Sequence, residues 1–433
     1  MRIVHLVPHF DNRGNGVVNA AVDLACSQAR LGMSVTLAGV GEGSFRRLLE
    51  SEGVTVHSVP GTSAPRLFSS YLFGVRRVLR NCRPDIVHAH MVPGAVIGRL
   101  LRRGLRYKLI TSVHSSGRFG TRLMSLGDRV VCVSNYLASE MRERGVPSRK
   151  IRVVHNGPLG SPRPPSPSVG RRLNHPAIVT IGEPASHKGL GDLISAFSLL
   201  ADREPNAHLY ILGDSIGRSQ FERQAQASPC SERIIFCGFV ADPTAYLQSA
   251  DIFVLASHRE GFGLALAEAR KSGCAIVASD VGGIPEVLDG GSAGILVPAH
   301  SPERLASALL ELIENPTKRD FFRMKAASNL EWLSCQRTAT ETSPSTTRLG
   351  VERPQNIGNA RQLSQDDFGL GPGGQATMCF WRHFASPTKS SNPLNHFSPI
   401  APTGKLETAW GRYSPTVPGF PGYSALSEPQ IAR

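Results

Sequence analysis

Short runs rich in β-branched residues alternate with longer amphipathic stretches through residues 1–157, and this alternation constrains the fold more than any other feature of the sequence. The runs RIVHLVP, SVTLAG, PDIVHAH and KLITSVH are typical of strands, and VVNAAVDLACSQARLG between two of them is typical of a helix. A second alternating series fills residues 177–342. Strand and helix in turn predict parallel sheets covered by helices on both faces, so we expect an α/β protein with two doubly wound, Rossmann-like domains.

Two other segments interrupt or follow these series. Residues 158–176 contain five closely spaced prolines and several serines, which predicts a linker. In residues 343–433, 31 of 91 positions are Pro, Gly or Ser and no periodicity is present, so we expect a disordered tail. Ligands of doubly wound domains bind beyond the carboxyl ends of the strands, which places the expected site in a cleft between residues 1–157 and 177–342.

The apolar runs and the cysteines point to an intracellular protein. No run approaches the roughly 18 apolar residues of a membrane span, and the N-terminus lacks a secretion signal, so we expect a cytoplasmic protein. The eight cysteines occur singly and without a C-x-x-C pair, which favours reduced, packed thiols over a zinc or redox site.

The net charge of +14 is concentrated in one segment. Residues 53–127 carry twelve Arg or Lys and one acidic residue, Asp85. Within them, residues 66–83 and 98–108 mix apolar and basic side chains as interfacial helices do, which favours an anionic membrane surface, such as the inner face of the plasma membrane, or an anionic acceptor. Nucleic acid is disfavoured because no zinc-finger, RNP-like or helix-turn-helix pattern is present, and a merely solvated basic face remains the alternative.

The stretch HREGFGLALAEA, residues 258–269, holds two carboxylates on either side of a glycine turn. Gly261 and Gly263 allow a tight turn and leave backbone N–H groups exposed where a helix begins, which is a site for a phosphate. Glu268, about two turns into that helix and among apolar residues, needs a partner, and the two hydroxyls of a ribose would serve. A Glu268 that simply faces solvent is the alternative.

These residues, followed by SGCAIVASDVGGIPEVL, resemble the E-x7-E signature and downstream G-G-x-P-E of the retaining glycosyltransferases of family four. The resemblance extends over about residues 1–333 and implies the GT-B fold, two Rossmann-like domains facing across a cleft. It implies that Glu268 holds the ribose of a nucleotide sugar and that Glu260 contacts the transferred sugar. The backbone amides of Gly261, Phe262 and Gly263 would lie close to the donor.

The resemblance assigns roles to three further residues. Lys188 in SHKGLGDL matches the family lysine that contacts the donor diphosphate, and a point charge there stabilises the leaving group without a metal. Gly16 matches the N-terminal glycine loop. A dinucleotide site at that loop is disfavoured, because Asn19 stands where G-x-G-x-x-G requires its last glycine. His114 matches the histidine near the reacting face of the sugar.

The chain departs from the family pattern in two places. Glu183 stands where an arginine is usual, five residues before Lys188, and a carboxylate beside a diphosphate would repel it. His187 and Arg259 are candidates to supply the missing positive charge. At the C-terminus, residues 320–341 begin a helix of the kind that crosses back to the N-terminal domain, but the Pro/Ser-rich tail replaces its expected continuation.

The expected function is transfer of a sugar from a UDP- or GDP-linked donor to a hydroxyl of a surface-glycan or lipid-linked acceptor, with retention of configuration. Exopolysaccharide and lipopolysaccharide are the acceptor types that the resemblance implies. We expect no metal, no other cofactor and no nucleic-acid partner. A sugar-nucleotide epimerase of the same shape and a non-catalytic nucleotide- or glycan-binding relative remain the alternatives.

Overall fold

The computed structural model describes most of the two alternating series. The described residues are 1–12, 14–60, 65–115, 117, 120–163, 172–215 and 217–343. Residues 164–171 of the predicted linker and residues 344–433 of the predicted tail lie outside them, as does Cys379. The other seven cysteines form no disulfide with one another.

The first series folds into a seven-stranded sheet in which every strand pairs in parallel with its neighbours, in the order β3-β2-β1-β4-β5-β6-β7. The strand order reverses direction between β1 and β4, which is the switch point where doubly wound sheets bind ligands. The strands are β1 (Arg2–His9), β2 (Ser34–Val40), β3 (Thr55–Val59), β4 (Ile86–Ala89), β5 (Lys108–Val113), β6 (Arg129–Cys132) and β7 (Ile151–Val153).

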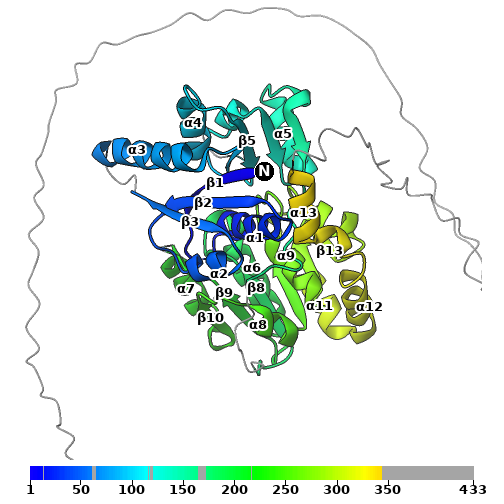
Figure 1. Ribbon diagram of the computed structural model, residues 1–433. Helices are drawn as coiled ribbons and strands as arrows, with labels where there is room; N and C mark the ends of the chain where they lie inside the picture. The colour runs from blue at the N-terminus through cyan, green and yellow to red at the C-terminus, as the bar shows by residue number, and fades with distance from the viewer. Residues whose placement is uncertain are drawn as a thin grey trace, which may run out of the picture. The chain divides into compact units, whose positions relative to one another are not determined.

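Helices cover both faces of this sheet (Figure 1). They are α1 (Gly16–Arg30), α2 (Arg46–Ser51), α3 (Pro65–Cys82), α4 (Val92–Leu101) and α5 (Asn135–Glu143). Val35 and Leu37 of β2 pack in one core cluster with α1 and α2, whereas Ala38 packs in another with Val75 and Leu79 of α3. Neighbouring β2 residues thus serve opposite faces, as a sheet that is covered on both sides requires.

The second series forms a six-stranded parallel sheet in the order β10-β9-β8-β11-β12-β13, with its switch point between β8 and β11. The strands are β8 (Ala177–Ile181), β9 (His208–Leu212), β10 (Ile234–Gly238), β11 (Ile252–Leu255), β12 (Ala275–Ser279) and β13 (Ile295–Val297). The helices are α6 (Leu190–Leu200), α7 (Arg218–Gln226), α8 (Thr244–Ser249), α9 (Leu264–Lys271), α10 (Ile284–Val287), α11 (Pro302–Glu314) and α12 (Pro316–Ala326). The predicted α/β fold class is confirmed.

The chain returns to the N-terminal domain after α12. The backbone amide of Leu159 donates to the carbonyl of Leu333 at 3.0 Å, and the carbonyl of Leu159 accepts from the amide of Cys335 at 2.8 Å. Helix α13 (Cys335–Thr342) then lies beside α1 (Figure 1), and Arg337 donates to the carbonyl of His155 at 2.6 Å. The crossing helix is therefore present in a short form, and residues 320–341 belong to two separate helices, α12 and α13, and not to one.

The basic segment is only partly helical. Residues 66–83 correspond to α3, but residues 98–108 do not form one helix, because α4 ends at Leu101. Gly104 adopts φ +86°, and Lys108 already begins β5. A left-handed glycine ends a helix readily, so the second predicted interfacial helix was wrong beyond its first turn.

Candidate functional site

Glu260 lies in the loop from β11 to α9 and Glu268 lies within α9, and the loop makes two close backbone contacts that only glycine permits. A Cβ at Gly261 would lie 2.2 Å from the carbonyl oxygen of His114, and a Cβ at Gly282, where φ is +58°, would lie 1.9 Å from that of Glu260. Both distances are shorter than any real contact, so these positions require glycine. The glycines thereby bring the end of β5 and the G-G-x-P-E segment against the Glu260 loop.

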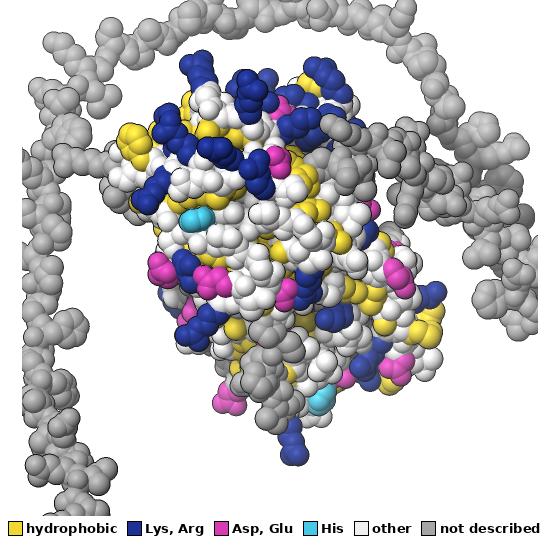
Figure 2. Space-filling view, in the orientation of Figure 1, with side chains coloured by type: hydrophobic (Ala, Val, Ile, Leu, Met, Phe, Trp, Pro, Cys, Tyr) yellow, Lys and Arg dark blue, Asp and Glu magenta, His cyan; other side chains and the backbone are white. Residues whose placement is uncertain are grey.

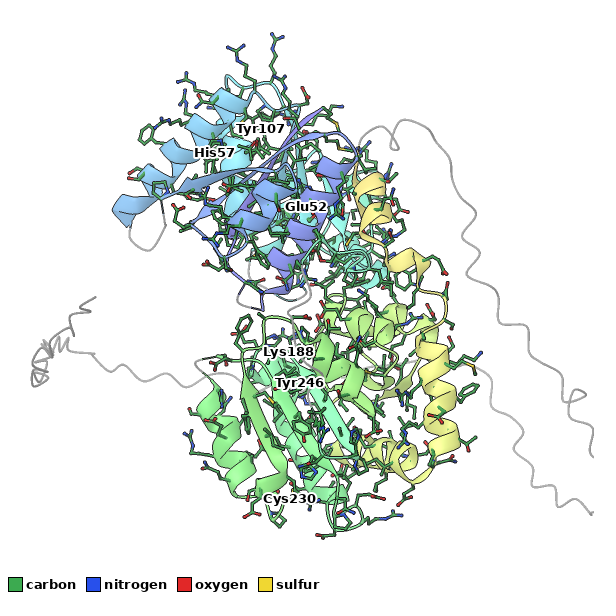
Figure 3. All side chains as sticks on the ribbon, turned by 60° about the horizontal axis from the view of Figure 1, so that its bottom comes forward. Glu52, His57, Tyr107, Lys188, Cys230 and Tyr246 are labelled. Carbon is green, nitrogen blue, oxygen red and sulfur yellow. The ribbon has the colours of Figure 1, made fainter. Side chains whose placement is uncertain are left out.

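Glu260 forms an ion pair with Lys188. The Lys188 Nζ donates to Glu260 Oε2 at 2.6 Å, and the two side chains retain 27% and 14% of their exposure. Lys188 ends a 3-10 turn after β8, at one end of the second sheet (Figure 3), and Glu260 follows β11. The two strands flank the switch point, so a cation and a carboxylate meet where a ligand of this sheet would bind.

The N-termini of α1 and α9 meet at the same place. A Cβ at Gly16, the first residue of α1, would lie 3.4 Å from Leu264, the first residue of α9. The side chain of Asn15 caps α1 by accepting from the amide of Val17 at 3.0 Å. Two helix N-termini that face one site add their partial positive charges, which favours an anion between them.

Glu268 has a partner that the sequence did not suggest. The Arg163 guanidinium donates to Glu268 Oε1 at 3.2 Å and to the two carboxylate oxygens of Asp23 at 3.0 and 3.2 Å. Burial raises the pKa of Glu268, and the nearby Arg163 opposes that rise. These three side chains form one cluster, with Glu268 from α9, Arg163 from the linker and Asp23 from α1. Arg163 is therefore bonded to the carboxylate that is predicted to hold the ribose.

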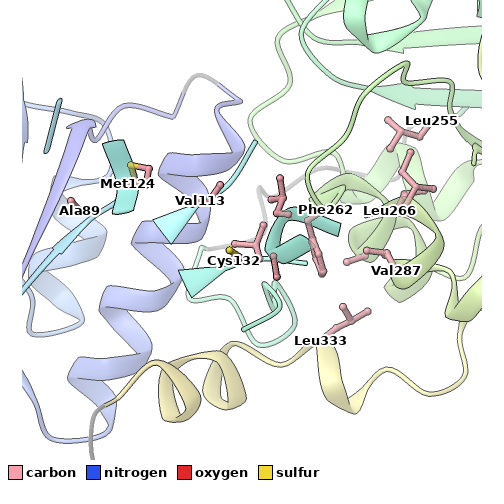
Figure 4. Close-up of a cluster of buried hydrophobic side chains, with 14 of the residues drawn as sticks. Ala89, Val113, Met124, Cys132, Leu255, Phe262, Leu266, Val287 and Leu333 are labelled. Atoms are coloured by element: carbon pink, nitrogen blue, oxygen red, sulfur yellow. The ribbon is translucent and has the colours of Figure 1, made fainter. Parts of the chain in front are cut away.

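Phe262 is held by packing. Its side chain is 2% exposed and belongs to a core cluster that also includes Val113, Cys132 and Leu333 (Figure 4). The Trp332 ring lies edge-on at 6.3 Å. The side chain of Phe262 is therefore not available to a donor.

Glu286, the last residue of the G-G-x-P-E segment, joins the two domains. Its carboxylate accepts from the backbone amides of Asn135 and Tyr136 at 2.8 and 2.9 Å and lies 2.9 Å from His155 Nε2. Burial alone would raise the pKa of Glu286, but these hydrogen bonds hold it below its usual range. The carboxylate caps α5 across the domain boundary, a role that the sequence analysis missed.

Glu183, which stands where the family usually has an arginine, has an exposed side chain. Burial and the neighbouring Lys188 ammonium lower the pKa of His187, so this imidazole is neutral near pH 7 and adds no positive charge. Arg259 reaches the loop after β5, where its Nη1 would lie 2.7 Å from a Cβ on Gly117. Of the two candidates for the missing arginine, only Arg259 carries a charge.

Comparisons with known proteins match both domains. The family described as Glycosyltransferase Family 4 matches residues 14–157, and that described as Glycosyl transferases group 1 matches residues 166–328. The D-inositol 3-phosphate glycosyltransferase of an Arthrobacter species is 26% identical, over 67% of this chain and 79% of its own length. The lipopolysaccharide core biosynthesis glycosyltransferase LpsD of Rhizobium meliloti is also 26% identical, over 74% and 90%. The structure of Anabaena HepE with UDP-glucose superposes with a TM-score of 0.68 at 18% identity and covers 81% of this chain and all of HepE, which shows the GT-B fold.

Proposed function

We propose that this chain is a group 1 glycosyltransferase, since its two domains match glycosyltransferase family models, and that it transfers a sugar from a nucleotide-sugar donor to an acceptor hydroxyl with retention of configuration. The observation that carries the proposal is the Lys188–Glu260 pair beside the two converging helix N-termini. A nucleotide sugar needs a positive environment at its diphosphate and an acceptor of hydrogen bonds at its sugar, and this site offers both within a few ångströms.

Each predicted residue has a place in this mechanism. Lys188 and the amides at the start of α1 and α9 stabilise the diphosphate as its bond to the anomeric carbon breaks. Glu260 accepts hydrogen bonds from the sugar hydroxyls, and Glu268 receives the two ribose hydroxyls. The acceptor oxygen forms the new bond on the same face of the sugar, and its proton passes to an oxygen of the leaving diphosphate. No side chain forms a covalent intermediate, and Lys188 supplies the charge for which other enzymes use a metal.

The substrate class rests on relatives. HepE was solved with UDP-glucose, and LpsD is named for lipopolysaccharide core biosynthesis. We therefore infer a UDP- or GDP-linked donor and an acceptor that is a surface glycan, of exopolysaccharide or lipopolysaccharide type, or its lipid-linked precursor.

Thermal unfolding of the full chain with UDP, GDP, ADP and their sugars tests the donor site. A ligand at about 100 times its dissociation constant adds about 2.7 kcal/mol to the stability of the folded state, which raises the melting temperature clearly. We expect one nucleotide to do so and Glu268→Ala to abolish the rise. Product analysis then tests the reaction, because a transferase extends the acceptor with an unchanged anomeric configuration, whereas an epimerase alters the sugar without any acceptor. No rise with any nucleotide would reject the proposal in favour of a non-catalytic protein.

The contact between Arg163 and Glu268 favours the non-catalytic alternative, because the guanidinium occupies the carboxylate that would hold the ribose. One variant tests whether Arg163 obstructs the donor. Arg163→Ala is expected to tighten nucleotide binding several-fold, because the guanidinium no longer competes with the ribose for Glu268. The variant is also expected to be less stable by about 1–3 kcal/mol, because Asp23 loses its charged partner in a buried position. Calorimetric titration with the nucleotide and urea unfolding measure the two effects. Arg337→Ala, which removes an arginine that donates to the carbonyl of His155 and not to Glu268, is the control. Unchanged affinity in Arg163→Ala would show that Arg163 does not obstruct the donor.

We also propose that the basic segment binds an anionic membrane. On α3, Phe73 is 68% exposed and Arg76, Arg77 and Arg80 are exposed beside it. Figure 2 shows Lys and Arg side chains gathered on the part of the surface where α3 and α4 lie in Figure 1. No helix among the described residues is long and apolar enough to cross a membrane. The cytoplasmic location and the contact with the inner face of the plasma membrane stay predictions.

Vesicle co-sedimentation measures this binding. The full chain is expected to bind vesicles rich in phosphatidylglycerol, to dissociate from them at high salt and not to bind neutral vesicles. Arg77→Gln with Arg80→Gln is expected to weaken binding about 30-fold, at about 1 kcal/mol per arginine near the surface. Lys271→Gln with Arg304→Gln removes two exposed charges from the other domain and should change little. If both double variants lose vesicle binding equally, the net charge of the protein, and not α3, causes the binding.

A further inference from the structure

Four histidines from three neighbouring strands lie ring against ring in the N-terminal domain. His5 belongs to β1, His88 and His90 lie on and just after β4, and His114 follows β5. Ring centroids are 5.3 Å apart for His5 and His90, 4.3 Å for His88 and His90, and 5.5 Å for His90 and His114. The first three side chains are at most 2% exposed. The cluster therefore runs from the interior of the sheet, across its switch point, to the residue that touches Gly261.

Three of these rings form a single line of hydrogen bonds that begins at Gln28 of α1. Gln28 Oε1 lies 2.8 Å from His5 Nε2, His5 Nδ1 lies 3.0 Å from His90 Nε2, and His90 Nδ1 lies 3.2 Å from His114 Nε2. The described residues show no hydrogen-bond partner for His114 Nδ1. His88 stands outside the line, because its Nε2 bonds to Ser112 Oγ at 2.7 Å.

If every ring is neutral, all hydrogen bonds in this line run in the same donor-to-acceptor direction. Burial lowers the pKa of His5 and His114 to about 4 and that of His90 well below its ordinary value, so near pH 7 each ring carries one N–H. A neutral imidazole that donates through one nitrogen must accept through the other. Because the carbonyl oxygen of Gln28 accepts, His5 donates through Nε2, and the same choice follows for His90 and His114. His114 then holds its proton on Nε2 and an open lone pair on Nδ1.

We propose that Gln28, His5 and His90 are positioning residues that fix the tautomer of His114, so that its Nδ1 accepts a hydrogen bond from a hydroxyl of the donor sugar. The proposal rests on the proposed function only for the identity of that hydroxyl. His114 Nδ1 and the Glu260 carboxylate would both be acceptors, and the contact between Gly261 and the His114 carbonyl brings their two segments together. Two fixed acceptors orient a sugar by its hydroxyl protons, and a ring free to exchange tautomers would present an acceptor only part of the time.

Nitrogen NMR of the full chain, labelled with 15N-histidine, reads the tautomer directly and needs no substrate. The His114 signals, assigned by their loss in His114→Asn, are expected to show a protonated Nε2 and an unprotonated Nδ1. A protonated Nδ1 in the wild-type protein would overturn the proposal before any variant is made.

Two variants of Gln28 and one control separate a relay from simple packing. Gln28→Leu removes the acceptor and is expected to give His114 a mixture of tautomers, whereas Gln28→Glu keeps an acceptor and is expected to keep the wild-type tautomer. Ser112→Ala disturbs His88 alone and should leave His114 unchanged. An unaltered His114 spectrum in a folded Gln28→Leu would reject the relay.

Activity provides the second readout. With the donor identified by thermal shift, kcat/KM of Gln28→Leu is expected to fall about tenfold, and that of Ser112→Ala to stay near the wild-type value. If the wild-type protein binds no nucleotide, the proposed function fails while the NMR result still decides whether the relay exists. A fixed tautomer with unchanged kcat/KM in Gln28→Leu would show that the relay does not serve the sugar.

Discussion

Lys188→Met is expected to lower turnover by about 10²–10³, the loss seen when one electrostatic contact to a developing negative charge is removed. Methionine keeps most of the length and volume of the lysine side chain, so the change acts mainly on charge. Lys188 stands 2.6 Å from Glu260, and its loss removes the side-chain cation nearest to that carboxylate. The diphosphate would then leave against an unpaired carboxylate.

Steady-state kinetics with the identified donor measure this loss. Lys271→Met, at the exposed C-terminal end of α9, changes an equal charge away from the site and is expected to keep turnover within about twofold of the wild type. Lys188→Arg keeps the charge with a different shape and is expected to retain an intermediate rate. Wild-type turnover in a folded Lys188→Met would remove Lys188 from the mechanism.

The fold could be predicted because parallel sheets covered on both faces leave a clear signal. Their strands are nearly continuous apolar runs, and long crossovers must separate them. The prediction failed locally at residues 98–108, where an amphipathic composition continued past the end of α4. Gly104 has room to adopt a left-handed conformation there, and β5 begins four residues later. Composition alone carries no information about that competition between a helix and a strand.

The site could be predicted only as far as its short motifs extend. Glu260, Lys188 and His114 belong to recognisable segments, and the structure brings those segments together. The Arg163 contacts could not be predicted, because the arginine lies 105 residues from Glu268 and 140 from Asp23 in the sequence. The G-G-x-P-E segment was noticed, but the bonding of Glu286 to α5 depends on how two separately folded sheets meet.

Arg270 shows the same limit within a single helix. The sequence places it in an amphipathic stretch, where an arginine is expected to face water. In the structure its side chain is fully buried and donates to the carbonyl of Ala326 at 3.0 Å, to that of Ser328 at 2.7 Å and to Asp289 at 2.8 Å. Those acceptors come from the turn after α10 and from the end of α12, so only the packing of these later segments against α9 explains why a charge is tolerated there.

Lowering the pH from about 7 to about 4 is expected to destabilise the protein strongly, because four imidazoles are buried in neutral form. Burial lowers the pKa of His5 and His114 to about 4, and those of His88 and His90 well below the ordinary value. In the unfolded chain each imidazole takes up a proton near pH 6.5, whereas the folded protein does not. Stability is therefore lost as the pH falls from about 6.5 through about 4, at up to about 1.4 kcal/mol per pH unit for each histidine, and this term is flat above that window.

Urea unfolding at a series of pH values isolates the histidine contribution from that of the carboxylates, which also titrate near pH 4. His88→Asn can still bond to Ser112 and removes one buried imidazole, so its stability is expected to fall less steeply between pH 6 and 5, by about 1.4 kcal/mol per pH unit. His300→Asn removes an imidazole whose side chain is 69% exposed and serves as the control. The two variants lose the same titratable group, so a difference between their slopes comes from the surroundings of His88, which are its burial and the neighbouring imidazoles of His5 and His114. Equal slopes would mean that the His88 ring gains its proton in the folded protein as easily as in the unfolded chain.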